Sequence, residues 1–148
     1  MMIIYSVAKG IAQRLESIPD EMFSMKVMGD GMAIKPEENW IYSPVDGTVT
    51  MIFETKHAIG ITANDGTEVL IHIGVDTVNL HGKPFDTYVH VNDKVKEGEL
   101  LMSSDFKMIE EKNLCASIMT IVTNRKVKIL KSEGSITKDE PVLEVIEA

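Results

Sequence analysis

The chain has 148 residues, of which 44% are hydrophobic and 26% charged, a composition typical of an ordinary globular protein. This excludes a fibrous repeat, a coiled coil and a largely disordered chain, and the length fits a single domain over residues 1–148. The net charge of −8 has the wrong sign for neutralising a phosphate backbone, so nucleic acid is not an expected partner.

The single cysteine, Cys115, excludes an internal disulfide and a cysteine-rich zinc site. This favours a reducing compartment, and we expect the cytoplasm. No stretch approaches the roughly 20 apolar residues that span a membrane, so direct insertion into a membrane is not expected either.

Short runs of β-branched and apolar residues alternate with turn signals along the chain, which predicts an all-β protein. In chain order, the expected strands are Ile3–Val7, Met32–Ile34, Thr48–Phe53, Ala58–Thr62, Val69–Ile73, Tyr88–Val91, Ile118–Val122, Val127–Leu130 and Val142–Ile146. A short helix is expected over Asp105–Asn113, and a helical turn over Asp20–Ser24. Together these elements predict an antiparallel β-sandwich or barrel with one or two short peripheral helices.

Two pairs of similar segments within the chain suggest an internal duplication. Residues 4–10 (IYSVAKG) resemble residues 41–47 (IYSPVDG), with glycine at the same offset. Residues 95–102 resemble residues 136–143, where in both cases a polar turn leads into an apolar strand. Because the two pairs of similar segments occur in the same order, they favour a compact sandwich of related halves over an open solenoid, which needs at least three repeats.

Two of the four histidines, His57 and His72, lie inside apolar strand-like runs, where burying an imidazole costs free energy unless its nitrogens find partners. A turn at Asp65-Gly66 separates the runs, so they are predicted to pair as a hairpin that brings the rings together. His81 and His90 lie in polar, turn-rich segments and are expected on the surface.

Two chemistries suit a pair of adjacent imidazoles. The spacing His72-x-x-x-Asp76 occurs in zinc peptidases, but the H-x-H motif that such sites also need is missing. The other chemistry is phosphoryl carriage by a nucleophilic histidine, with the second imidazole donating to the phosphate.

Several motifs resemble, in order and spacing, the enzyme IIA component of the glucose family in the phosphoenolpyruvate-dependent sugar phosphotransferase system. They include residues 29–36 (GDGMAIKP), 43–47 (SPVDG), 55–61 (TKHAIGI), 70–78 (LIHIGVDTV), 110–112 (EEK) and 123–124 (TN). The resemblance implies a β-sandwich of two antiparallel sheets. It also implies a histidine that takes a phosphoryl group from the phosphocarrier protein HPr and passes it to a cysteine of enzyme IIB, without a required cofactor.

By this resemblance, His72 is the phosphorylated residue. Its Nε2 is the nucleophile, while its Nδ1–H donates to the carbonyl of Gly74 and so sets the reactive tautomer. His57 matches the imidazole that hydrogen-bonds the phosphate, and Thr55 matches the hydroxyl that orients His57.

The resemblance also implies a partner surface around the histidines. Asp30 and Asp76 match acidic residues that face basic residues of the carrier. The expected apolar part of this surface consists of Phe53, Ile59, Leu70 and Met32, with Met22, Phe23, Met25 and Met28 as an extension.

Two alternatives remain open. The first is a zinc-binding or regulatory docking module in which His57 and His72 hold zinc, with a further ligand from a regulated partner protein. The second is a lipoyl or biotinyl carrier, which lacks support because no lysine lies in the expected Met-Lys setting. The chain departs from the family pattern at Ile118-Met119, where Thr-Pro is usual, and at Ser104, where an aromatic residue is usual.

Overall fold

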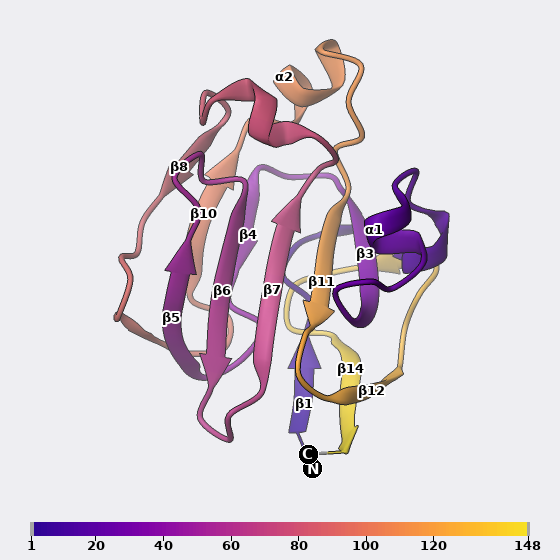
Figure 1. Ribbon diagram of the computed structural model, residues 1–148, viewed down its shortest axis with the longest axis vertical. Coiled ribbons are helices and arrows are strands. Elements are labelled where there is room, and N and C mark those ends of the chain that lie inside the picture. Colours follow the sequence, from indigo (N-terminus) through magenta and orange to yellow (C-terminus); the bar gives the residue numbers. More distant parts are fainter. Residues whose placement is uncertain (1, 148) are drawn as a thin grey trace.

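A computed structural model describes residues 2–147 as a stack of antiparallel sheets (Figure 1). The large sheet has eight strands in the order β13-β2-β3-β11-β7-β6-β5-β9. Its strands are β2 (Gly10–Arg14), β3 (Asp30–Pro36), β5 (Gly47–Ile52), β6 (Ala58–Ala63), β7 (Glu68–Ile73), β9 (Lys94–Val95), β11 (Ile118–Val122) and β13 (Ser135–Ile136).

Two three-stranded sheets cover the inner face of the large sheet. Their orders are β1-β14-β12 and β4-β10-β8. Their strands are β1 (Met2–Tyr5), β4 (Trp40–Tyr42), β8 (Phe85–Thr87), β10 (Leu100–Ser104), β12 (Lys126–Ile129) and β14 (Pro141–Glu147). The predicted antiparallel β-sandwich is therefore confirmed.

The main hydrophobic core lies between the large sheet and the two small ones. Alternation along β7 shows how the sequence builds it, because Val69, Ile71 and Ile73 point into the core and are at most 2% exposed. Full burial of such a side chain contributes about 1.5–3 kcal/mol. The intervening positions, which include Leu70 and His72, lie on the outer face of the sheet.

The similar segments 4–10 and 41–47 occupy equivalent places in the structure. After β1, the buried hydroxyl of Ser6 donates to the carbonyl of Ala8 over 2.8 Å. After β4, the buried hydroxyl of Ser43 donates to the carbonyl of Val45 over 2.7 Å. The same residue type therefore makes the same turn twice.

Strand pairing extends this duplication over the chain. One unit comprises β4 to β10 in sequence order, and the other comprises β1 to β3 followed by β11 to β14. The strand pair β1–β14 of one unit corresponds to β4–β10 of the other. In the same way β2–β3 corresponds to β5–β6, and β13–β2 corresponds to β9–β5. The contiguous unit, β4 to β10, is thus inserted into the other unit between β3 and β11, and β7 and β11 join the two units at the centre of the large sheet.

The helices are short and peripheral, as predicted. Helix α1 (Glu21–Ser24) begins after Asp20, whose carboxylate accepts from the backbone N–H of Met22 over 2.8 Å. Helix α2 (Phe106–Glu111) begins after Asp105, which caps it in the same way. Two 3₁₀ turns, η1 (Leu15–Ser17) and η2 (Thr77–Leu80), complete the elements. Among residues 2–147, no helix has the length and apolar character needed to cross a bilayer.

Two expectations about strands were wrong or incomplete. Residues 88–91 do not form a strand, because the backbone N–H of His90 donates to the Asp93 carboxylate and the Asp93 N–H donates back to the His90 carbonyl, which makes a turn. The strands β2, β4, β8, β9 and β13 were not predicted individually. Most of them have two or three residues, which is too short for a periodic hydrophobic pattern to be recognised.

Candidate functional site

The β6–β7 hairpin brings the two histidines together, as predicted. In this hairpin Ala58 pairs with His72, and the backbone N–H of Ile73 donates to the carbonyl of His57 over 2.8 Å. The two imidazole centroids are 5.1 Å apart, and the ring planes lie at 75° to each other. His57 itself lies just before β6 rather than within a strand.

Backbone geometry after β7 orients the His72 ring. Its Nδ1 lies 2.9 Å from the carbonyl oxygen of Gly74, so Nδ1–H donates there and Nε2 carries the lone pair. Burial, and to a smaller extent the proximity of His57, lower the pKa of His72 to about 4, against the opposing effects of the Gly74 carbonyl, Asp20 and Asp76. His72 is therefore neutral at physiological pH.

His57 is the more buried of the two histidines and is held by Thr55. It is 6% exposed, and its Nδ1 lies 2.5 Å from the Thr55 hydroxyl. Burial lowers the pKa of His57 as well, so it is also neutral. When the Thr55 hydroxyl donates to Nδ1, the proton of His57 resides on Nε2 and is free to donate to a ligand. Phe53 packs edge-on against His57, with centroids 5.0 Å apart.

Helix α1 supplies the other wall of the site. The Phe23 ring lies 4.8 Å from the His72 ring and belongs to a second, smaller hydrophobic cluster with residues of β3 and β11 on the outer face of the large sheet. Figure 1 shows α1 beside β3. The histidines open into a pocket of about 180 Å³. It is lined by Asp20, Met22, Phe23, Met28, His57, His72, Asp76, Thr77 and Val78.

Two carboxylates flank the pocket. Asp76, which was predicted here, has a left-handed backbone (φ 60°) and precedes η2. Asp20 also lines the pocket, although the sequence indicated only a helical turn there. The one signal that marks Asp20 is its position as N-cap after Pro19, and that signal concerns helix initiation rather than a binding site.

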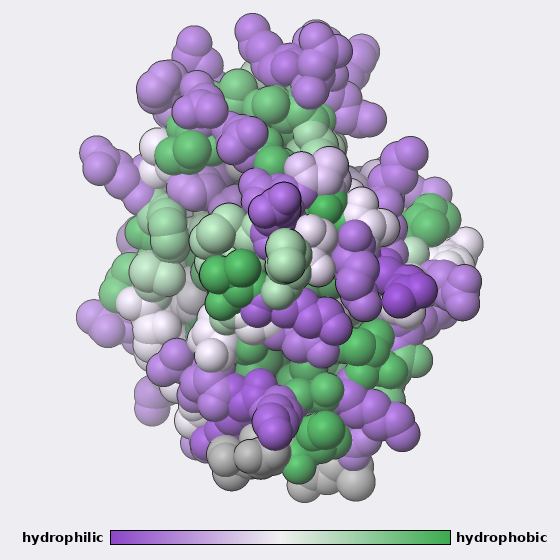
Figure 2. Space-filling model, turned by 45° about the vertical axis from the view of Figure 1, so that its right-hand side comes forward, coloured by the Kyte–Doolittle hydropathy of each residue, from purple (hydrophilic) through white to green (hydrophobic). Residues whose placement is uncertain are grey.

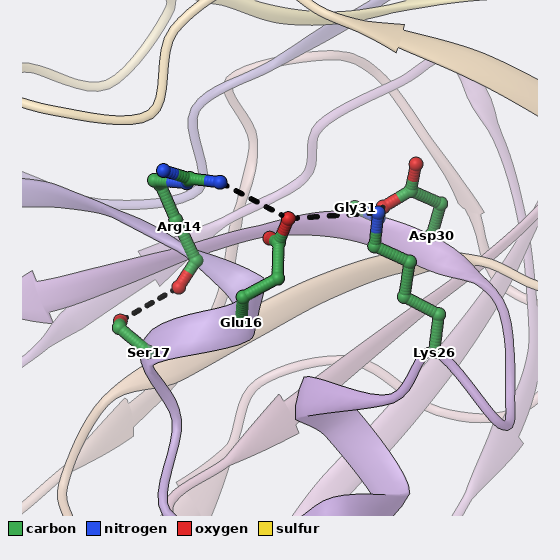
Figure 3. Close-up of polar contacts among 6 residues, drawn as sticks. All are labelled: Arg14, Glu16, Ser17, Lys26, Asp30 and Gly31. Atoms are coloured by element: carbon green, nitrogen blue, oxygen red, sulfur yellow. Dashed lines mark hydrogen bonds and ion pairs between the residues drawn. The ribbon is translucent and has the colours of Figure 1, made fainter.

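Asp30, which was predicted to flank the histidines and face a partner, is not part of the pocket lining. Its carboxylate accepts from the backbone N–H of Gly31 over 2.8 Å and forms an ion pair with Lys26 at 3.5 Å. Figure 3 shows that Lys26 also reaches Glu16, which in turn contacts Arg14. Asp30 therefore pairs with the segment that follows α1, whereas Asp20 lines the pocket beside the histidines.

The predicted apolar surface is only partly present. Phe53 is 38% exposed and contacts His57, whereas Leu70 lies on the outer face of β7 but is only 9% exposed. Ile59 and Met32 are at most 1% exposed in the main core, so their assignment to a surface is wrong. Met22, which was predicted as an extension of this surface and is 48% exposed, does line the pocket, together with Val78, which was not predicted and is 44% exposed. On the face shown in Figure 2, apolar side chains form small patches divided by hydrophilic ones.

The low pKa of His72 leads to a testable expectation. We expect its ring to titrate with a midpoint near pH 4, followed by NMR of ring-labelled protein. Because the unfolded chain binds this proton at the ordinary value of 6.5, the free energy of unfolding should decrease as the pH falls from 6.5 to about 4. A midpoint near 6.5 would mean that the ring is solvated and not held as described.

The pocket offers few ligands for a metal ion. Across residues 2–147, no three His, Cys, Asp or Glu side chains are grouped so that they could hold a metal ion. His57 and His72 supply two imidazole nitrogens, and zinc binding would need further ligands. A larger pocket of about 700 Å³ lies elsewhere, and its lining includes Tyr5, Asp46 and Glu97 but no histidine.

The fold and the histidine pair together define the class of protein. Among solved structures, the glucose permease IIA from Mycoplasma capricolum matches 96% of this chain and 94% of its own, with a TM-score of 0.90 and 33% sequence identity. Residues 2–127 match the family model described as the phosphoenolpyruvate-dependent sugar phosphotransferase system, EIIA 1. The chain belongs to this family, in its glucose-type branch, and is a phosphotransferase component. The resemblance seen in the sequence is confirmed.

Relatives carry this domain both alone and within longer proteins. The glucose-specific EIIA component of Oceanobacillus iheyensis is 44% identical over 89% of this chain and 82% of its own length. The beta-glucoside-specific EIIBCA component of Bacillus subtilis is 48% identical over 94% of this chain. The glucose-specific EIICBA component of Streptococcus pneumoniae is 44% identical over 96% of this chain. The chain spans 23% and 20% of these two longer relatives.

Proposed function

We propose that His72 accepts a phosphoryl group from phospho-HPr on Nε2 and passes it to a cysteine of enzyme IIB. The observation that carries this proposal is the bond from His72 Nδ1 to the Gly74 carbonyl, which leaves the Nε2 lone pair directed away from that carbonyl. In the first step, this lone pair attacks phosphorus and the bond from phosphorus to the donor breaks. In the second step, a thiolate attacks phosphorus and the bond to Nε2 breaks.

The surroundings of His72 suit both steps. A neutral imidazole needs no general base, so transfer depends mainly on positioning and on stabilisation of charge on the phosphoryl oxygens. Nε2–H of His57 supplies a donor for those oxygens, because Thr55 holds the other ring nitrogen. The transfer itself requires no cofactor.

The rim of the pocket is suited to bind a protein partner whose surface is basic and apolar. Asp20 and Asp76 offer negative charge, while Met22 and Val78 offer exposed apolar contact. HPr is the proposed donor that meets this rim. The EIICBA and EIIBCA relatives join this domain to further components, which supports enzyme IIB as the acceptor. We place the exchange in the cytoplasm, in keeping with the single free cysteine, Cys115.

Intact-mass measurement tests this proposal. The protein is incubated with phosphoenolpyruvate, enzyme I and HPr, and HPr is omitted from a parallel sample. We expect the gain of one acid-labile phosphoryl group that depends on HPr and is lost when enzyme IIB is added. If no phosphoryl group is gained, the carrier function is contradicted. Zinc titration would then examine the histidine pair as a metal or docking site for a regulated protein.

A further inference from the structure

The turn that follows β7 carries the carbonyl that orients His72. This turn runs from Ile73 to Thr77 and includes two residues with a left-handed backbone, Gly74 (φ 74°) and Asp76 (φ 60°). Such residues keep their conformation only where neighbouring groups hold them. The position of the Gly74 carbonyl, and with it the His72 tautomer, therefore depends on what fixes this turn.

Backbone hydrogen bonds fix one side of the turn. The N–H of Gly74 donates to the carbonyl of Ser117 over 2.8 Å, and the N–H of Val75 donates to the carbonyl of Cys115 over 3.0 Å. Both acceptors belong to the segment that leads into β11. The peptide groups before and after Gly74 are thereby tied at their N–H ends to a neighbouring part of the chain.

The side chain of Thr77 fixes the other side. Thr77 is fully buried (0% exposed), and its hydroxyl donates to the carbonyl of Ile73, the carbonyl of the peptide group whose N–H belongs to Gly74. That peptide group is therefore held at both ends, by Thr77 and by Ser117.

The methyl group of Thr77 adds a steric restraint. A Cβ atom placed on Gly74 would collide with the Thr77 methyl and would lie 2.7 Å from the Cys115 carbonyl oxygen. The space beside Gly74 is thus already filled, so the peptide cannot shift in that direction without moving Thr77.

We propose that Thr77 is a positioning residue for phosphoryl transfer, which keeps the Gly74 carbonyl on Nδ1 of His72 and so keeps Nε2 as the nucleophile. This inference rests on the proposed function of His72. Thr77 lines the same pocket as the histidines, but it acts through Ile73 and Gly74. Without its hydroxyl, the buried Ile73 carbonyl loses its donor and the Gly74 peptide is free to turn away. The ring proton then redistributes to Nε2, which blocks the lone pair.

Three variants test the role of the hydroxyl. Thr77→Val keeps the shape and removes the hydroxyl, and Thr77→Ser keeps the hydroxyl and removes the methyl. Thr120→Val is the matched control, because Thr120 is 1% exposed on the adjacent strand β11 and its hydroxyl oxygen is buried without a partner. Circular dichroism verifies folding, and Thr77→Ala replaces Thr77→Val if the latter does not fold.

The readouts are the His72 tautomer, from ring nitrogen shifts in NMR, and the initial rate of phosphoryl acceptance from phospho-HPr. We expect Thr77→Val to populate the Nε2–H tautomer and to lower the rate about 10-fold, the size of effect typical of residues that orient a functional group. Thr77→Ser should keep the Nδ1–H tautomer and stay within about 2-fold of the wild-type rate, as should Thr120→Val.

The inference is overturned if Thr77→Val keeps the Nδ1–H tautomer at the wild-type rate. It is also overturned if Thr77→Ser loses as much rate as Thr77→Val, because retention of the hydroxyl would then not preserve phosphoryl acceptance. The tautomer measurement needs no phosphorylation. If the wild-type protein gains no phosphoryl group, the proposed function fails, while the NMR result still decides the role of Thr77.

Discussion

Replacement of His72 by Ala is expected to abolish the gain of a phosphoryl group from phospho-HPr. No other imidazole among the described residues combines an Nδ1 bonded to a backbone carbonyl with a place on the lining of this pocket. His57 does not substitute for it, because its Nδ1 is occupied by Thr55 and the residue is only 6% exposed. Removal of a nucleophile eliminates the covalent intermediate rather than slowing its formation.

The measurement is intact mass after incubation with phosphoenolpyruvate, enzyme I and HPr. His90→Ala is the matched control, since it also removes one imidazole but from a side chain that is 91% exposed and outside the pocket. The control should gain one phosphoryl group like the wild type. A phosphorylated His72→Ala protein would move the acceptor to another residue and contradict the assignment.

Replacement of His57 by Ala is expected to leave the final extent of phosphorylation unchanged and to slow transfer onward to enzyme IIB by about 10²-fold. The nucleophile in the first step, His72, is neutral, so its approach adds no negative charge beside the phosphoryl oxygens. The nucleophile in the second step is a thiolate, whose charge repels those oxygens. A donor from His57 therefore matters more in the second step.

Single-turnover transfer from the isolated phosphorylated protein to enzyme IIB measures this effect. Thr55→Val should produce a smaller loss in the same step, because it removes the group that sets the His57 tautomer but leaves the ring in place. Onward transfer at the wild-type rate in His57→Ala would exclude His57 from the mechanism.

The histidine pair could be predicted from the sequence because its geometry is local. His57 and His72 flank a single hairpin, and the register of that hairpin follows from the hydrophobic pattern of β6 and β7 together with the Asp65-Gly66 turn. The bond from His72 to Gly74 spans only two residues. Thr55 and Asp76 lie close to the histidines along the chain, so the same hairpin brings them to the site.

The partner surface was harder to predict, because it depends on which face of a strand each side chain occupies. Ile59 follows Ala58, which pairs with His72, and one step along a strand reverses the direction of the side chain. Met32 also faces the core, because side chains alternate along β3 and its neighbours Gly31 and Ala33 occupy the positions of the opposite face. Ile59 and Met32, which belong to the sequence motifs of the site, therefore lie on the core face of the sheet and not on the face that carries the histidines.

The sequence by itself determined the all-β class, the duplicated turns, the family and the pairing of His57 with His72, because all of these are encoded in short contiguous motifs. Only the tertiary structure decided that one unit is inserted within the other and that Asp20 lines the pocket of the histidines. Asp20 reaches the site because α1 folds across the outer face of the sheet and packs Phe23 against His72. Such a contact joins segments about fifty residues apart and depends on burial of apolar surface, which carries no local sequence signature.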